Sequence, residues 1–203
     1  MLLNFDPLSA SRRYHTMIQT LIPRPVAWVL SDNGDNSLNL APFSYFAPVC
    51  SDPALLMISI GKKPDGSLKD TRRNILERKH FVVHIASALM AQKVTQSSAT
   101  LAFGDSELVH CGLETNSFEP FSLPRLADCS VAYGCDFYDV KEFGDLPQAV
   151  LFGRVRWLYL DDAIVQEEDG RLAVAAEKID PLARLGGDQY WVKGQVVDIS
   201  RPR

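Results

Sequence analysis

The densest group of polar donors in this 203-residue sequence is the segment Lys69-Asp70-Thr71-Arg72-Arg73-Asn74. It stands where a helix is expected to begin, and Asp70 or Thr71 can cap that helix. A helix N-terminus offers free N–H groups and the positive end of a dipole, which suits a phosphate group. Lys69, Thr71 and Asn74 could add donors, whereas Asp70 would repel the phosphate unless it faces away as a cap. The alternative is a capped surface helix with a basic first turn.

A second group lies in PLARLGGDQY, residues 181–190. Its adjacent glycines, Gly186 and Gly187, either allow the backbone to approach a flat ligand or simply form a tight turn. Arg184 stands among leucines, and its alternative role is that of a surface arginine lying over apolar neighbours. This segment is therefore a binding candidate only in combination with others.

The third group is NLAPFSYF, residues 39–46, which follows the turn cluster at residues 32–37. A proline removes a hydrogen-bond donor from a β-ladder, so Pro42 is out of place in a central strand. Ala41 and Pro42 would form a flat apolar wall, with unpaired backbone groups for the polar edge of a ring and the hydroxyl of Ser44 beside it. The alternative is a bulged edge strand.

Other chemistries find little support in the sequence. No Ser/His/Asp order or pair of carboxylates emerges, and the acidic run at residues 167–169 is typical of a solvated loop. His84 alternates with the apolar residues of its predicted strand, which favours a satisfied or exposed strand histidine over a catalytic one. No metal is expected, because the four histidines are scattered and no cysteines have C-x-x-C spacing.

Composition places further limits on function. The net charge is −4, which argues against general nucleic-acid binding. No apolar stretch reaches about 18 residues and no secretory signal is visible, so neither a membrane span nor export is expected. Four cysteines do not make a disulfide scaffold in a chain of this length, and reduced thiols are the simplest interpretation. We therefore expect a cytoplasmic protein, with residues 1–203 forming one domain.

The predicted elements are mainly strands. We expect strands over residues 25–31, 38–45 with an interruption at Pro42, 54–60, 81–86, 129–138, 149–160 and 190–199. Helices are expected over residues 8–21, with Ser9 or Ser11 as cap, over 70–79 and over 87–97. Residues 98–128 look like an irregular excursion, a lid or a lobe. Hairpin-like spacing without β-α-β alternation predicts a closed β-barrel with helical decoration.

Taken together, these segments resemble the flavin reductase-like family, the FMN-binding split-barrel flavoproteins. The resemblance is carried, in order along the chain, by PRPVAW (23–28), NLAPFSYF (39–46), SDP (51–53), KDTRRNI (69–75), LFGRV (151–155) and PLARLGGDQY (181–190). It covers most of the chain and is least clear over residues 98–140.

The resemblance implies a six-stranded Greek-key barrel, a homodimer, and FMN in a groove near the subunit interface. It places these residues along the isoalloxazine ring and ribityl chain: Arg24, Pro25, Val26, Ala27, Asn39, Leu40, Ala41, Pro42, Phe43 and Ser44. Ser59 would reach the ribityl chain or phosphate, Lys69, Thr71 and Asn74 would hold the phosphate, and Arg184 and Tyr190 would approach the flavin. Ser44 would face flavin N5 and tune it, and Asp70 is assigned to capping.

The implied function is that of a flavoprotein oxidoreductase that transfers a hydride from NAD(P)H to FMN and supplies reduced flavin to a partner oxygenase. One alternative holds FMN tightly and passes electrons to a small molecule, a metal chelate or oxygen. Others are a non-catalytic flavin-binding module and a β-barrel interaction protein without cofactor. The choice between NADH and NADPH stays open, with Arg12-Arg13 and Arg72-Arg73 as candidates for a 2′-phosphate site.

Overall fold

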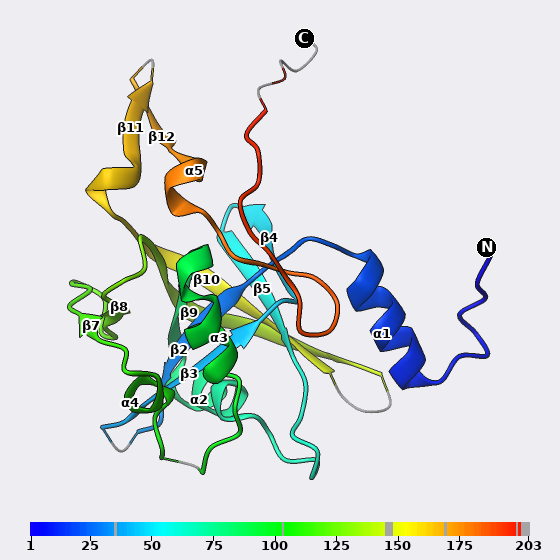
Figure 1. Cartoon of the computed structure of the whole chain (residues 1–203). Helices are drawn as coiled ribbons and strands as arrows, with labels where there is room; N and C mark the ends of the chain where they lie inside the picture. Colours follow the sequence, from blue (N-terminus) through cyan, green and yellow to red (C-terminus); the bar gives the residue numbers. More distant parts are fainter. Residues whose placement is uncertain (35, 103, 145–147, 169, 198, 200–203) are drawn as a thin grey trace.

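The structure is a computed structural model that describes residues 1–34, 36–102, 104–144, 148–168, 170–197 and 199 (Figure 1). Its main feature is a seven-stranded antiparallel sheet with the order β3-β2-β6-β9-β10-β5-β4. The strands are β2 (Ala27–Asp32), β3 (Leu38–Phe43), β4 (Phe46–Ser51), β5 (Ala54–Ile60), β6 (His80–His84), β9 (Val131–Phe143) and β10 (Gln148–Leu160). The prediction of a mainly β fold is confirmed.

Smaller elements surround this sheet. The helices are α1 (Ala10–Thr20), α2 (Asp70–Arg78), η1 (Ala88–Met90), α3 (Ala91–Gln96), α4 (Glu107–Cys111), η2 (Asp162–Ile164) and α5 (Ala176–Ile179). One small sheet has the strand order β1 (Arg24–Pro25), β13 (Ala183–Arg184) and β14 (Tyr190–Trp191). Two further pairs are β7 (Thr115–Asn116) with β8 (Arg125–Leu126), and β11 (Val165–Glu168) with β12 (Arg171–Val174). Among the described residues, no helix is both long enough and apolar enough to cross a membrane.

The sheet curls on itself. Strands β3 and β4 stand at opposite ends of the strand order, yet only Ser44 and Tyr45 separate them along the chain. The backbone N–H of Ser59 in β5 donates to the carbonyl of Tyr45 at 2.8 Å, and β3 also contacts β5. Register shifts in β10, between Phe152 and Gly153 and again between Val155 and Trp157, are bulges that bend the long β9–β10 pair. A flat sheet could not bring its two edges together in this way.

Two buried clusters explain why β2 is apolar on both faces. The inner cluster includes Val29, Ile58 and Leu151 and draws buried residues from every strand of the sheet except β4, with Ile75 of α2 among them. The outer cluster includes Trp28 and Leu30 and is covered by η1, α3, α4 and residues between 112 and 129. The sheet has seven strands, whereas six were expected. The additional strand is β4, which extends the edge of the sheet and contributes only the partly buried Phe46 to the inner cluster.

Residues 98–128, expected to be a lid or lobe, pack against this barrel wall. Leu108, Phe118, Leu123 and Leu126 are all buried in the outer cluster. The segment also covers the free edge of β3, where the Glu107 carboxylate accepts a hydrogen bond from the backbone N–H of Leu40 at 2.9 Å. Burial raises the pKa of Glu107, and the bond from Leu40 opposes that shift.

The prediction that Pro42 interrupts its strand is wrong. Pro42 lies within β3, opposite Trp28 of β2. Leu40, two residues earlier, directs its N–H away from β2 toward Glu107. Since directions alternate along a strand, the nitrogen of Pro42 also points outward, where no ladder bond is lost. The edge position of β3 therefore makes the proline compatible with a regular strand.

The helix caps and the last strand were also predicted from the sequence. Ser9 caps α1 as expected, accepting a bond from the N–H of Arg12 at 3.3 Å. Neither Asp70 nor Thr71 caps α2, because Lys69 occupies the N-cap position and makes no side-chain capping bond. Of the strand expected over residues 190–199, the described residues form only β14, and residue 198 lies outside them. The described tail beyond β14 extends away from the body (Figure 1).

His84 is fully buried and ties β6 to two other segments. Its Nδ1 lies 3.0 Å from the carbonyl oxygen of Trp28, and its Nε2 accepts a bond from the N–H of Leu126 at 2.9 Å. A carbonyl can only accept, so Nδ1 carries the hydrogen and the ring is neutral. Burial lowers the pKa of His84 to about 4 from the ordinary 6.5, while the Trp28 bond raises it and Arg125 lowers it.

We expect the free energy of unfolding to fall as the pH is lowered from about 6.5 toward 4, because the unfolded chain binds a proton that folded His84 refuses. His84 accounts for a loss of about 3 kcal/mol in the free energy of unfolding. This loss is absent above the pKa of the unfolded chain and is complete near the pKa of the folded chain. Urea unfolding at several pH values measures it. His84→Gln keeps a donor and an acceptor but does not titrate, and an equally steep pH dependence in that variant would contradict the assignment.

Candidate cofactor site

A cavity of about 370 Å³ opens where β3 turns into β4. Its apolar wall is formed by Val26, Pro42 and Phe43, and Ser44 and Tyr45 continue it around the turn. The remaining lining residues are Tyr14, Ser59, Gly61, Lys62, Lys69, Val94, Thr95, Ser98, Gln148, Arg184, Asp188 and Tyr190. Apolar walls with a few fixed polar groups are typical of small-molecule sites, and this volume lies within their usual range of roughly 300–1,000 Å³.

The charges of the cavity favour an anionic ligand. Lys62, Lys69 and Arg184 line it, against the single carboxylate of Asp188. Among the described residues, neither Lys62 nor Lys69 forms an ion pair. The ammonium group of Lys69 lies 5.7 Å from the centre of the Phe43 ring, and desolvation by the surrounding walls lowers its pKa although the residue as a whole is exposed. Such a cation is stabilised by an anion placed beside it.

Several polar lining residues are held by contacts among their own side chains. Gln148 of β10 donates to the hydroxyl of Ser59 at 3.0 Å, which joins two lining residues of neighbouring strands. The hydroxyl groups of Thr95 and Tyr190 lie 2.9 Å apart, and the guanidinium of Arg184 stacks on the Tyr190 ring at 4.7 Å. These contacts link the polar lining residues in pairs.

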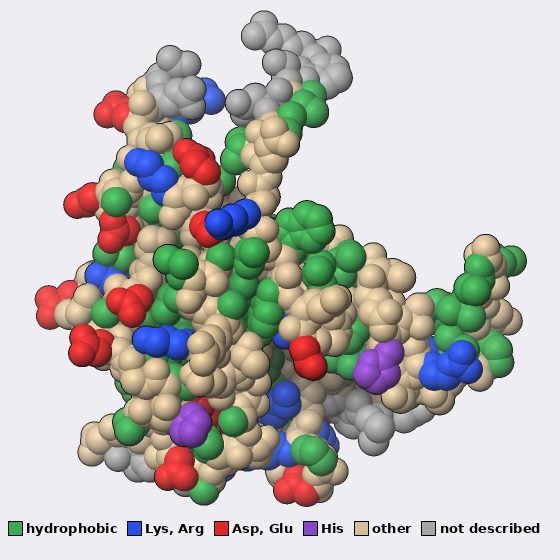
Figure 2. All heavy atoms as spheres, in the orientation of Figure 1, with side chains coloured by type: hydrophobic (Ala, Val, Ile, Leu, Met, Phe, Trp, Pro, Cys, Tyr) green, Lys and Arg blue, Asp and Glu red, His purple; other side chains and the backbone are tan. Residues whose placement is uncertain are grey.

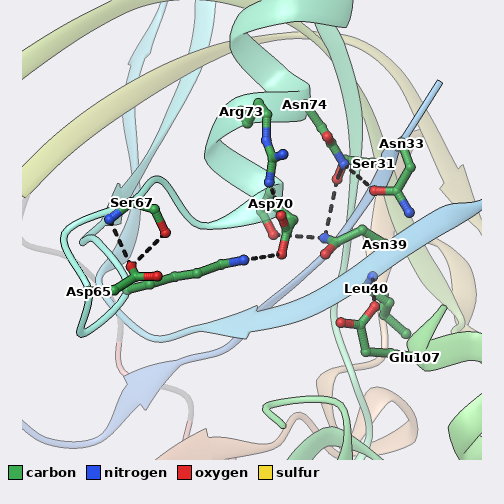
Figure 3. A network of polar contacts seen from close by, with 12 residues as sticks. Ser31, Asn33, Asn39, Leu40, Asp65, Ser67, Asp70, Arg73, Asn74 and Glu107 are labelled. Carbon is green, nitrogen blue, oxygen red and sulfur yellow. Dashed lines mark hydrogen bonds and ion pairs between the residues drawn. The ribbon is translucent and has the colours of Figure 1, made fainter. Parts of the chain in front are cut away.

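A buried polar network docks the start of α2 onto the β2–β3 hairpin (Figure 3). The amide of Asn39 donates to the hydroxyl of Thr71 at 2.8 Å and to that of Ser31 at 3.3 Å. The amide of Asn74 donates to Asn33 at 2.8 Å and to Ser31 at 3.2 Å. All five side chains are at most 6% exposed. The network fixes the N-terminus of α2, and with it Lys69, against β3.

Thr71 and Asn74, expected to hold a phosphate with Lys69, belong to this network and do not line the cavity. Their direct contact with a phosphate stays a prediction, while Lys69 does line the cavity. The carboxylate of Asp70, expected to cap the helix, is instead paired with Lys63 at 2.8 Å and with Arg73. The charge of Asp70 is therefore balanced by Lys63 and Arg73.

The other predicted residues divide between the cavity and its supports. The structure brings together Val26, Pro42, Phe43, Ser44, Ser59, Lys69, Arg184 and Tyr190 along the cavity. Ala27 and Leu40 are buried in the inner and outer clusters, Ala41 packs against the inner one, and Pro25 is exposed. Arg24 is buried beneath the wall and donates to the hydroxyl of Ser44 at 3.4 Å.

Sequence reasoning missed several lining residues, among them Tyr14, Tyr45, Lys62 and Gln148. Lys62 had a visible signal, since two lysines follow Gly61 at the end of a buried strand, whereas Tyr14 and Gln148 come from distant elements with no motif. The arginines proposed for a nicotinamide 2′-phosphate do not line this cavity. Arg72 and Arg73 pair with Glu142 and Asp70, respectively.

The chemical types of the lining residues fit FMN. The flat wall of Val26, Pro42 and Phe43 suits a planar ring system, and the hydroxyl and amide groups of Ser59 and Gln148 suit a polyhydroxylated chain. Lys62 and Lys69, which have no carboxylate partner in the part of the chain that the structure describes, suit a phosphate. The lining residues thus include a suitable group for the ring, the ribityl chain and the phosphate of FMN.

Comparisons with known proteins agree with this chemistry. A family model described as "Flavin reductase like domain" matches residues 19–183. Component B of nitrilotriacetate monooxygenase from Bacillus cereus is 30% identical, with a TM-score of 0.89 and coverage of 98% of each chain. The 2-nitrobenzoate 2-nitroreductase NbaA of Pseudomonas fluorescens is 26% identical, with a TM-score of 0.87 and coverage of 100% of this chain and 96% of its own.

A more distant solved structure identifies the fold. A protein with a split barrel domain from Shewanella frigidimarina NCIMB 400 is 18% identical, with a TM-score of 0.84 and full coverage of both chains. The curled seven-stranded sheet is therefore a split barrel, as the family resemblance implied.

We expect Thr71→Val to lower the free energy of unfolding by about 1–3 kcal/mol, because it leaves the buried Asn39 amide without its closest acceptor. The exposed Thr115 of β7 offers a matched control, and Thr115→Val should stay within about 0.5 kcal/mol of wild type. Urea unfolding measures both. If Thr71→Val leaves stability unchanged but weakens flavin binding, Thr71 faces the ligand and not the network.

Proposed function

The chain belongs to the flavin reductase like domain family, a family of flavin-binding oxidoreductases, and from this we propose that it is an NAD(P)H-dependent FMN reductase. The observation that carries the proposal is the cavity itself, in which an apolar wall stands beside lysines that have no carboxylate partner among the described residues. Bound FMN would supply the hydride-accepting chemistry. The work left to the protein is binding, orientation and electrostatics.

The proposal gives each group of lining residues a task. Val26, Pro42 and Phe43 would support the ring, with Ser44 at its polar edge. Lys69 and Lys62 would bind the phosphate. This assignment supports a reaction without an acid–base pair, since hydride transfer requires alignment of two rings more than movement of a proton.

Arg184 and Tyr190 would form the opposite side of the slot. Their stacked pair is held by Thr95 on α3 and by the bond from Arg184 to the carbonyl of Gly187 at 2.6 Å. The tyrosines Tyr14 and Tyr45 at the cavity provide apolar surface for a second ring, that of the nicotinamide.

We also propose that the reduced flavin serves a partner oxygenase. The support is the 30% identity, over nearly the whole of both chains, to a protein named as a monooxygenase component. The alternative, a flavoprotein that keeps FMN and reduces a small molecule itself, has support in the 26% identity to a nitroreductase. Flavin that stays bound through gel filtration while a nitroaromatic acceptor is reduced would favour this alternative.

A homodimer is the third part of the proposal. The N-terminal arm and the C-terminal tail project from the body and carry hydrophobic side chains (Figures 1 and 2). Met1, Leu2, Val196 and Val197 are each more than half exposed. Apolar surface on projecting arms is stabilised when a second copy covers it. A monomeric mass at micromolar concentration in sedimentation equilibrium would contradict this part.

We expect Lys69→Met to weaken FMN binding about 10- to 100-fold, the equivalent of one charge-assisted hydrogen bond. Riboflavin lacks the phosphate, so its affinity should not change. Calorimetric titration of both flavins measures the difference, and the exposed Lys178, which donates to the carbonyl of Ala163, gives Lys178→Met as control. Equal losses for FMN and riboflavin would show that Lys69 does not meet the phosphate.

The experiment that tests the proposed activity is anaerobic oxidation of NADH and of NADPH by the purified protein with FMN. The proposal expects FMN-dependent oxidation of at least one nicotinamide, followed at 340 nm for the nicotinamide and at 450 nm for the flavin. Binding of FMN without such oxidation would instead support a flavin-binding module. No binding of FMN at micromolar concentration would contradict the flavin site altogether.

A further inference from the structure

Arg24 is a buried cation that holds three chain segments together. Its side chain is 9% exposed and donates to the carbonyls of Ile18 and Leu21 at 2.5 and 2.9 Å and to that of Leu185 at 2.8 Å. A fourth bond, at 3.4 Å, runs from its Nε to the hydroxyl of Ser44. Among the described residues, no carboxylate pairs with it. The guanidinium is thus satisfied almost entirely by backbone oxygens.

Each segment that Arg24 joins also lines the cavity. Helix α1 carries Tyr14, Leu185 lies between the lining residues Arg184 and Asp188, and the β3–β4 corner carries Ser44. The bonds to the three carbonyls are shorter than the bond to Ser44, so the carbonyls determine the position of the guanidinium. The guanidinium in turn presents a donor to the Ser44 hydroxyl. A lysine could not make these bonds at once, because it lacks the planar fork of arginine.

The Arg24 bond also sets the role of the Ser44 hydroxyl. An arginine has donors only, so the Ser44 oxygen must be the acceptor of this bond. The hydrogen of the hydroxyl is then left for another acceptor, and among the described residues no bond from Ser44 to the protein consumes it. Because Ser44 lines the cavity, that hydrogen is available to a ligand atom there. A cationic donor on the oxygen strengthens the hydroxyl as a donor in turn.

We propose that Arg24 is a positioning residue that makes Ser44 a directed hydrogen-bond donor to the edge of the flavin ring. The assignment builds on the proposed flavin site and adds a buried residue that does not itself line the cavity. It predicts that Arg24 affects the flavin through Ser44 and not independently of it.

A double-mutant cycle on the midpoint potential of bound FMN tests this assignment. The potential reports the ratio of affinities for oxidised and reduced flavin, a quantity that loss of stability alone does not change. Ser44→Ala should change that ratio roughly threefold to tenfold, as expected for one hydrogen bond. Arg24→Lys should change it in the same direction. In a protein that already carries Ser44→Ala, Arg24→Lys should have no further effect on the ratio.

A matched control separates this role from simple support of the fold. Arg125 is also 9% exposed and also donates to backbone carbonyls, those of Leu126 and Ala127, but it does not line the cavity. Arg125→Lys and Arg24→Lys should both lower the melting temperature. Only Arg24→Lys should move the potential.

The proposal is overturned if Arg24→Lys shifts the potential equally with and without Ser44→Ala, or if it leaves the potential unchanged. Ser44→Ala provides a second test should Arg24→Lys not fold, because it leaves the carbonyl bonds of Arg24 in place. An unchanged potential in that variant also overturns the proposal. Failure of the wild-type protein to bind FMN, by contrast, refutes the flavin site itself.

Discussion

The buried bonds among Ser31, Asn33, Asn39, Thr71 and Asn74 are the constraint on which the site depends. Buried amides are costly unless they are paired, so these bonds stabilise the observed docking of α2 on the β2–β3 hairpin. That docking sets Lys69 beside Phe43 and lets Ile75 enter the inner cluster. The position of the cation in the cavity is thus a consequence of packing within the barrel.

The location of the cavity follows from the curling of the sheet. Strands β3 and β4 are consecutive in the chain but lie at opposite ends of the strand order, so the chain must leave one edge and join the other within Ser44 and Tyr45. At this corner regular backbone pairing stops, and polar groups become available to a ligand. Segments distant in sequence, the end of α1 and the β13–β14 loop, meet the corner and are tied to it by Arg24. The same geometry that splits the barrel therefore provides the walls of the site.

The sequence predicted the elements better than it predicted the directions of side chains. The apolar runs of β2 and β5, the Ser9 cap and the place of Pro42 in the cavity wall could be inferred from local patterns, whereas Ala41, expected in the same wall, packs against the inner cluster. Thr71 and Asn74 have the donors that a phosphate needs, but those donors turn toward Asn39 and Asn33, which no local pattern reveals. Tyr14 and Gln148 line the cavity from α1 and β10, and their approach to the β3–β4 corner depends on contacts far apart along the chain.

We propose that the cavity at the β3–β4 corner binds FMN with the ring on the apolar wall and the phosphate at Lys69. A crystal structure of the protein with FMN tests it most directly. We expect the isoalloxazine against Pro42 and Phe43, the hydroxyl of Ser44 within hydrogen-bond distance of the ring edge, and the phosphate within reach of the Lys69 ammonium. Flavin bound elsewhere on the chain, or bound here with its phosphate directed away from Lys69, would contradict it.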